Sequence, residues 1–422
     1  MTDRVNDYST LVVPTGNAQE TFHRWFHFKE GFSHQLLPRL LKDEGHPLDS
    51  SIKLLDPFLG SGTSLVSAAK LAREGEFEAQ LVGCERNPVM YRIAAAKTAA
   101  AVAGESLCEQ FDVASKRFWR RARADCRQAL TTPSTTLNNE SYFDATEVSE
   151  LLAMGSAAAS EEDPVLRTLL QAAVACSVEK TARLRRDGRA LRHQPTKTVV
   201  NARSAVQAVL AMMREDLASV GRVGEVTAHI RPGDARDLSN LPGDADWAFF
   251  SPPYPNNIDY TEVYKIEAWV LGLYSDMDDM KQQRLSTLRS HPSVKFADEY
   301  DYIGTEDESA ISDLLTPILR AIPKGRYETG RHQVVKGYTD DMLRVMRSVH
   351  SKAKPGGRAC VVVGNSSHGK SGEHYVLAAD LLVASVSKLA GWTVDEIRVC
   401  RRPARRADSG GYLRESAVML TR

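Results

Sequence analysis

The sequence lacks a net charge, because its 54 basic side chains equal its 54 acidic ones. A chain-wide attraction to nucleic acid is therefore excluded, and any surface of that kind must be a local patch. The six cysteines include no Cys-x-x-Cys pair, which argues against structural zinc and disulfides and suits a reducing cytoplasm. No apolar run approaches the roughly 20 residues of a membrane span, and the polar first nine residues do not resemble a signal peptide. These absences predict a cytoplasmic protein without a membrane partner.

Short apolar segments alternate with helical patterns along much of the chain. Strands are expected at residues 52–55, 79–84, 225–230, 246–250 and 358–363, with a closing pair at 393–399 and 416–420. This alternation predicts an α/β fold with a mostly parallel, doubly wound sheet, whose ligands bind at the carboxyl ends of the strands. A helix is expected after Gly31, with Ser33 as its N-cap.

The same patterns divide the chain into four parts. Residues 1–50 are an N-terminal arm with an aromatic stretch, and residues 51–104 supply the first half of the sheet. Residues 105–222 are rich in Ala, Arg, Glu and Leu and are too long for a simple crossover, so they predict a helical insertion. Residues 223–422 supply the second half of the sheet, with a polar loop insertion at about 275–335 and a second helix expected to begin at Tyr375.

The first strand runs into a glycine turn, Asp56-Pro57-Phe58-Leu59-Gly60-Ser61-Gly62-Thr63. Two glycines let the backbone approach a ligand, and the helix that follows offers unpaired amides and a positive dipole. The spacing is not Gly-x-Gly-x-x-Gly, and no Lys-Ser/Thr pair makes it a phosphate loop. Glu85 ends the next strand, where a carboxylate is placed to hold ribose hydroxyls; an ordinary surface glutamate is the alternative.

A second turn, Ser251-Pro252-Pro253-Tyr254, follows the strand at 246–250. Two prolines set φ, remove two amide donors and prevent the strand from continuing, so the turn is a rigid corner. Alone it would be an ordinary turn. Together with the glycine turn, Glu85 and the Gly233-Asp234-Ala235 segment, it places a fourth candidate element at a strand end.

These elements resemble the S-adenosylmethionine-dependent amino methyltransferases of DNA. The resemblance implies a Rossmann-like methyltransferase fold with a seven-stranded sheet and, for the Phe28–Ser33 stretch, a motif that flanks the methionine group; core packing is the alternative for that stretch. It implies cofactor contacts from Phe28, Lys29, Phe32, Ser33, Asp56, Pro57, Phe58, Gly60, Ser61, Gly62, Thr63, Glu85, Asp234 and Ala235. It assigns catalysis to Ser251, Pro252, Pro253 and Tyr254, with no metal.

A serine at the first position of the corner is commoner in cytosine-N4 enzymes, and aspartate or asparagine in adenine-N6 enzymes. We therefore expect methylation of cytosine N4 in a base flipped out of double-stranded DNA, with Ser251 Oγ and the Pro252 carbonyl accepting the amino hydrogens and Tyr254 stacking on the base. Adenine N6 is the alternative. An RNA guanine-N2 methyltransferase and a non-catalytic nucleic-acid-binding subunit are further alternatives.

The densest basic stretch, residues 180–197, carries one aspartate against many cations. Such a run is either a solvated face or a surface that follows DNA phosphates. The expected DNA contacts are Arg183, Arg185, Arg186, Arg189 and Arg192. Arg289 is added from a basic stretch at 284–291, for which an ordinary loop is the alternative. A restriction or phage-defence protein is a candidate partner, and the sequence sets no oligomeric state.

Overall fold

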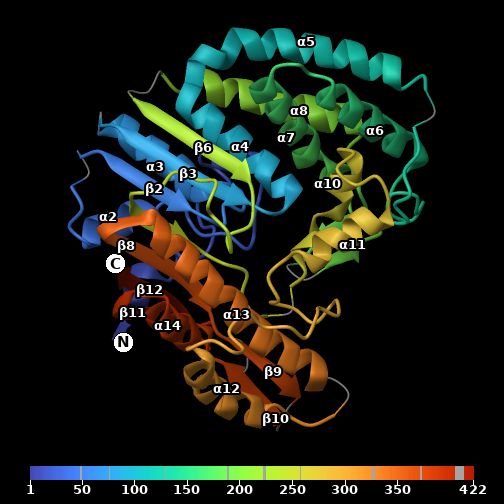
Figure 1. The fold of residues 1–422 in the computed structure, drawn as a ribbon. Helices are drawn as coiled ribbons and strands as arrows, with labels where there is room; N and C mark the ends of the chain where they lie inside the picture. Colours follow the sequence, from blue (N-terminus) through green and yellow to red (C-terminus); the bar gives the residue numbers. More distant parts are fainter. Residues whose placement is uncertain are drawn as a thin grey trace.

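The central sheet has eight strands in the described part of the chain, in the order β1–β11–β12–β8–β7–β2–β3–β6 (Figure 1). The computed structural model describes the whole chain except residues 48–49, 76, 129, 188–189, 222–224, 257, 326–327, 371–372 and 404–412. The strands are β1 (Thr2–Asp3), β2 (Ile52–Asp56), β3 (Ala79–Glu85), β6 (Val226–Pro232), β7 (Ala245–Phe250), β8 (Ala353–Gly364), β11 (Thr393–Arg401) and β12 (Glu415–Thr421).

Most neighbouring strands of this sheet are parallel. The pairs β2–β3, β2–β7, β3–β6 and β7–β8 are parallel, whereas β12 is antiparallel to both β8 and β11. The α/β fold with a mostly parallel sheet is therefore confirmed. The strand count differs from the expected seven because the two-residue β1 adds a parallel edge strand beside β11.

Successive residues of each strand enter two different hydrophobic cores, one on each face of the sheet. Leu54 and Phe249 belong to the first core, and their neighbours Leu55 and Phe250 belong to the second. This alternation follows from the period-2 geometry of a strand, and apolar residues on both faces are typical of a sheet covered by helices on both sides.

Helices cover both faces. On the first core lie α2 (Leu36–Asp43), α3 (Thr63–Glu74) and α4 (Pro88–Ala103); on the second lie α12 (Glu308–Ala321), α13 (Glu328–Lys352) and α14 (Ala379–Leu389). Short helices include α1 (Val5–Tyr8), η1 (His23–Trp25), η2 (Gly104–Leu107) and η3 (Glu179–Thr181). No described helix is both long and apolar enough to cross a membrane.

The segment between β3 and β6 forms a helical layer at the top of Figure 1. It contains α5 (Cys108–Asp125), α6 (Ala145–Ala159), α7 (Pro164–Val178) and α8 (Ala202–Ala218). A small hairpin, β4 (Leu184–Arg186) with β5 (Leu191–His193), lies between α7 and α8. The buried side chains of this layer are continuous with the first core, so the layer packs on the same side as α4.

Two segments differ from their expected local structure. The stretch 275–335, expected to be a polar loop insertion, contains α11 (Met277–Leu285), α12 and the start of α13. Two short helices, α9 (Tyr260–Val263) and α10 (Lys265–Val270), precede it. The helix expected from Tyr375 begins at Ala379 instead. Residues 366–370 and 373–377 pair as the antiparallel strands β9 (Ser366–Lys370) and β10 (Glu373–Leu377), because alternating Tyr375 and Leu377 enter the second core in strand geometry.

Replacing Gly155 with alanine is expected to destabilise the contact between α6 and α10. A Cβ at Gly155 would lie 1.9 Å from the Val270 carbonyl oxygen, whereas one at Gly243 would have no atom nearer than 3.9 Å. Overpacking costs about 1–3 kcal/mol, which outweighs the about 0.5–1 kcal/mol that alanine gains in a helix. Urea denaturation should show a lower free energy of unfolding for Gly155→Ala but not for the control Gly243→Ala. Equal stability of the two variants would contradict this packing.

Candidate active site

The glycine turn begins at the end of β2 and leads directly into α3. Gly60 and Gly62 have φ of 50° and 83°, values that L side chains rarely adopt. A Cβ on Gly62 would lie 3.0 Å from Cα of Ala94, and one on Gly60 would lie 2.9 Å from Cε1 of Phe28. Gly62 therefore allows α3 to pack closely against α4, and Gly60 allows the aromatic stretch to reach the turn.

Asp56 holds this turn from inside the protein. Its carboxylate accepts hydrogen bonds from Ser64 Oγ and, at 2.9 Å, from the Phe58 N–H. Burial raises the pKa of Asp56 to about 7, against these two hydrogen bonds, which lower it. Asp56 is fully buried and lies behind the turn rather than on its ligand side.

Glu85, at the end of β3, joins that strand to the glycine turn. Its Oε2 accepts the Gly60 N–H at 2.8 Å, and its Oε1 accepts the Asn87 N–H at 2.7 Å. Burial raises the pKa of Glu85 to about 7. Asn87 in turn caps α4 by accepting hydrogen bonds from Val89 and Met90. Glu85 thus presents a half-buried carboxyl group that is bonded to the Gly60 amide and lines the same cavity as Gly60.

Asp234 follows β6 and is held as an ion. Burial favours its neutral form, but the hydrogen bond from Arg236, 2.7 Å between Nη2 and Oδ2, and the charge of Arg86 lower its pKa below the ordinary value. Arg236 also donates to Asp341 on α13 at 3.0 Å. Asp234 is therefore a fixed hydrogen-bond acceptor at the carboxyl end of β6.

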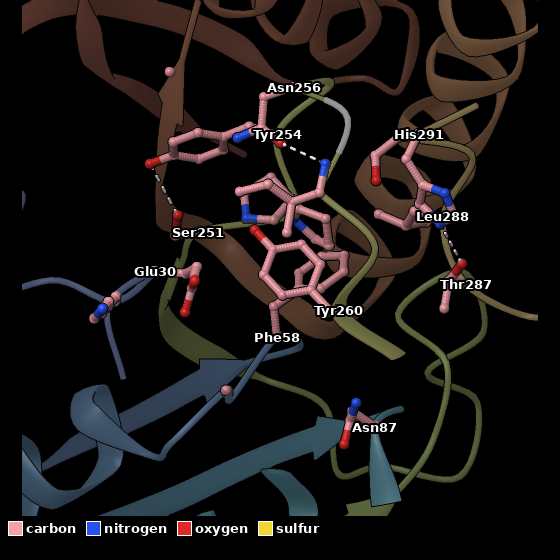
Figure 2. Close-up of a pocket in the computed structure, with 18 of the residues that line it drawn as sticks. Glu30, Phe58, Asn87, Ser251, Tyr254, Asn256, Tyr260, Thr287, Leu288 and His291 are labelled. Atoms are coloured by element: carbon pink, nitrogen blue, oxygen red, sulfur yellow. Dashed lines mark hydrogen bonds between the residues drawn. The ribbon is translucent and has the colours of Figure 1, made fainter. Parts of the chain in front are cut away.

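The Ser251–Tyr254 corner ends β7, next to the glycine turn at the end of the neighbouring β2. Ser251 Oγ donates to Tyr254 Oη at 3.3 Å, as Figure 2 shows. Burial raises the pKa of Tyr254 far above its ordinary value, so the phenol stays neutral. The Tyr254 ring lies over Gly364 of β8, where a Cβ would come within 2.7 Å of Cε2.

These elements open into one cavity of about 850 Å³. Sites for small molecules and cofactors commonly measure about 300–1,000 Å³, so the cavity has room for a nucleoside-sized ligand. The expected site residues that line it are Phe28, Lys29, Pro57, Phe58, Gly60, Glu85, Asp234, Ala235, Ser251, Pro252, Pro253 and Tyr254.

The other expected cofactor residues lie behind the cavity wall. Phe32 packs edge-on against Phe249 with ring centroids 5.0 Å apart, and Ser33 Oγ donates to the Thr15 carbonyl at 2.8 Å. Ser33 is not the N-cap of α2, because the helix begins at Leu36 and Gln35 occupies the N-cap position. The Ser33 hydroxyl instead accepts the Gln35 N–H at 3.4 Å, just before the helix. Asp56, Ser61, Gly62 and Thr63 belong to the turn but are buried and do not line the cavity.

Several lining residues were not expected from the sequence. They are Glu30, Asn87, Tyr260, His291, Arg401 and Glu415, of which the first four are labelled in Figure 2. Glu30 directly follows the expected Lys29, and Tyr260 lies six residues beyond Tyr254. Both could therefore have been predicted as lining residues from their closeness in sequence to a motif. His291, Arg401 and Glu415 come from distant segments with no local signal.

The basic residues separate into an exposed group and a buried group. Arg185 and Arg192 are exposed on the β4–β5 hairpin, where Arg192 pairs with Asp187 and lines the cavity mouth. Arg183 pairs with Asp144 at 3.1 Å. Arg189 lies outside the described residues.

Arg186 and Arg289 are buried, which corrects the expectation that both lie on a DNA-facing surface. Arg186 forms ion pairs with Glu179 and Glu267, and its guanidinium lies 5.3 Å and 5.1 Å from the ring centroids of Phe26 and Tyr264. Arg289 pairs with Asp340 and Asp341 of α13. Carboxylates that are remote in sequence draw both cations inward, because a buried charge requires a partner.

The strand order, the glycine turn and the Ser-Pro-Pro-Tyr corner together define a Rossmann-like site of the methyltransferase type. No protein-family model matches the chain. The chain is 24% identical over 429 residues to the type II methyltransferase M.BsoBI of Geobacillus stearothermophilus, covering 90% of this chain and 81% of that protein. It is 22% identical over 430 residues to the type II methyltransferase M.AvaI of Nostoc sp., covering 92% and 83%.

These relatives confirm the predicted resemblance to methyltransferases along nearly the whole chain. A structural alignment with the rRNA methyltransferase aviRa of Streptomyces viridochromogenes covers 97% of this chain and 93% of the aviRa chain, at 13% sequence identity and a TM-score of 0.34. The fold itself is defined by the strand order of the central sheet.

The Asp56→Asn variant tests the buried carboxyl group behind the turn. Its pKa is about 7 in the folded protein, against about 4 in an unfolded chain. Its contribution to stability is therefore complete below about pH 4 and is lost as the pH rises through about 7. Relative to Asp56→Asn, the free energy of unfolding of the wild type should fall between these pH values and then level off. Urea denaturation across pH checks this, with the exposed Glu78→Gln as control; parallel profiles would contradict it.

Proposed function

We propose that this chain is a DNA methyltransferase that transfers a methyl group from S-adenosylmethionine to the N4 amino group of a flipped cytosine. The observation that carries the proposal is that the Ser251–Tyr254 corner opens into the same cavity as Gly60 and Glu85. A cofactor end and a base end therefore share one cavity. The type II methyltransferases that resemble the chain support DNA as the substrate.

The residues around Gly60, Glu85 and Asp234 fit the adenosine and methionine parts of S-adenosylmethionine. Glu85 offers carboxylate oxygens to ribose hydroxyls, beside the Gly60 amide. Asp234 is an ionised acceptor for the adenine amino group, and Phe28 lies against the turn where the methionine part would pass. S-adenosylmethionine supplies, when bound, a methyl group activated on a positively charged sulfur.

The corner is suited to an exocyclic amino group, whose lone pair is delocalised into the ring. Ser251 donates its own hydrogen to Tyr254, which leaves the lone pairs of Oγ free to accept an amino hydrogen. The Pro252 carbonyl accepts the second, and Pro253, which has no N–H, adds no competing donor. Two acceptors that hold the two hydrogens make the nitrogen more tetrahedral, so that its lone pair is localised and points at the methyl group. Tyr254 and Tyr260 supply aromatic faces for the extruded base.

DNA approaches, in this proposal, over the β4–β5 hairpin at the cavity mouth. The buried Arg186 anchors the hairpin, and the Lys29 ammonium donates to the Arg186 carbonyl. Strand alternation then directs Arg185 outward, beside Arg192. A nuclease that cleaves the same unmethylated sequence is the partner that a type II system would supply.

Mass spectrometry of nucleosides tests the reaction, after DNA is incubated with the protein and methyl-labelled S-adenosylmethionine. Label in N4-methylcytosine is the expected result, and Ser251→Ala should reduce it by about 100-fold or more, as loss of one transition-state hydrogen bond does in other enzymes. Calorimetry should show unchanged cofactor binding by that variant. Label in N6-methyladenine, label only in RNA, or no label would each contradict the proposed reaction.

Replacing Arg185 and Arg192 together with glutamine is expected to weaken DNA binding. Each phosphate contact contributes about −0.9 to the slope of log K against log salt, so the slope should become shallower by up to about 2. Fluorescence anisotropy with duplex DNA at several salt concentrations measures it. The matched control removes Arg203 and Arg214, which pair with Glu150 and Asp112 away from the cavity. Equal slopes for the two double variants would assign the hairpin to an ordinary solvated face.

A further inference from the structure

The base end of the cavity contains an ion pair that the proposed reaction does not use. Arg401 ends β11 and Glu415 begins β12, and the two residues are opposite each other across the antiparallel pair. Arg401 Nη1 lies 2.9 Å from Glu415 Oε2. Both residues line the cavity.

Gly364 places this pair beside the catalytic corner. Glu415 is opposite Gly364 in the β8–β12 register. A Cβ on Gly364 would lie 2.7 Å from Tyr254 Cε2 and 3.2 Å from Glu415 Cγ. The Tyr254 ring and the Glu415 side chain thus converge over a residue that has no side chain of its own. Since Tyr254 bonds Ser251, Glu415 and its partner Arg401 border the space next to the methyl-accepting position.

Arg401 keeps hydrogen-bonding capacity for a ligand. Its side chain is 38% exposed, and Glu415 is its one hydrogen-bonding partner among the described residues. Nε–H and the Nη2 hydrogens are therefore available in the described structure. Glu415 is only 15% exposed, so it holds Arg401 from the protein side rather than from solvent.

We infer that Arg401 reads the N3 and O2 atoms of the flipped cytosine, with Glu415 as the positioning residue that orients its guanidinium. This inference rests on the proposed function and names the group that selects the base. Cytosine presents an amino donor next to two adjacent acceptors, N3 and O2. Ser251 and the Pro252 carbonyl accept from the amino group, and a planar guanidinium fork donates to the two acceptors, which reproduces the pattern of a paired guanine.

Adenine fits the same constellation poorly. Next to its amino group it has one acceptor, N1, followed by a C–H. One guanidinium N–H would therefore face carbon and lose its hydrogen bond, and a site built around polar groups discriminates strongly against a ligand that leaves them unpaired. The Arg401–Glu415 pair thus separates cytosine from adenine more directly than the serine of the corner does.

The test compares Arg401→Lys and Arg401→Met with Arg402→Met in the nucleoside labelling experiment. Lysine keeps the charge and the link to Glu415 but loses the two-pronged fork. Arg402 is the matched control, because it is the adjacent arginine and its guanidinium bonds Asp3 outside the cavity. Both Arg401 variants should lose about 10- to 100-fold in kcat/KM for cytosine, while Arg402→Met changes it less than threefold.

Two further measurements separate base reading from a general structural role. Cofactor affinity by calorimetry and the melting temperature should match the wild type in Arg401→Lys. Replacing the mapped target cytosine with 3-deazacytosine, which lacks the N3 acceptor, should impair the wild type but cause little further loss in Arg401→Met. Glu415→Gln should retain more activity than Glu415→Ala, because glutamine can still hold the guanidinium through its amide oxygen.

The outcomes distinguish the inference from the function on which it rests. Labelled cytosine with unchanged kcat/KM in both Arg401 variants would overturn the inference and leave the function intact. Equal, additive losses from 3-deazacytosine in the wild type and in Arg401→Met would overturn it as well. Labelled adenine would overturn the cytosine assignment together with the inference, and no label in the wild type would overturn both.

Discussion

The parallel alignment of β2, β3, β6 and β7 is the constraint on which the site depends. Parallel neighbours end at the same edge, so their last residues come together however far apart they lie in the sequence. The 2.8 Å hydrogen bond from the Gly60 amide to Glu85 joins two of these ends, and Ser251 follows a third. The site is therefore an edge of the sheet, and its precision comes from strands whose two faces are both buried.

Buried ion pairs hold segments outside the sheet in place. Arg186 joins the helical layer to Glu267 of α10, and Arg289 joins the loop after α11 to α13. Removing one member of such a pair would leave an uncompensated buried charge, which costs about 3–5 kcal/mol. Two of the arginines predicted from the sequence as DNA contacts, Arg186 and Arg289, are thus structural residues that hold other segments in place.

The elements that could be predicted share a local physical cause. The glycine turn, Glu85, Asp234 and the proline corner are each recognisable from a few adjacent residues, because turn chemistry and strand ends depend on short-range sterics. Arg289 could not be assigned in this way, since its partner Asp341 is 52 residues away. Arg401 and Glu415 had no local signal either, because they acquire their position from the β8–β12–β11 register.

The sequence by itself determined the class of fold, the glycine turn with Glu85, and the proline corner. Those features depend on apolar periodicity, on glycine and proline, and on the types of residue at strand ends. The tertiary structure decided which cations are exposed, which expected cofactor residues do not line the cavity, and which side chains lie beside the corner. Burial and pairing depend on contacts between remote segments, and the spacing of residues along one chain does not specify them.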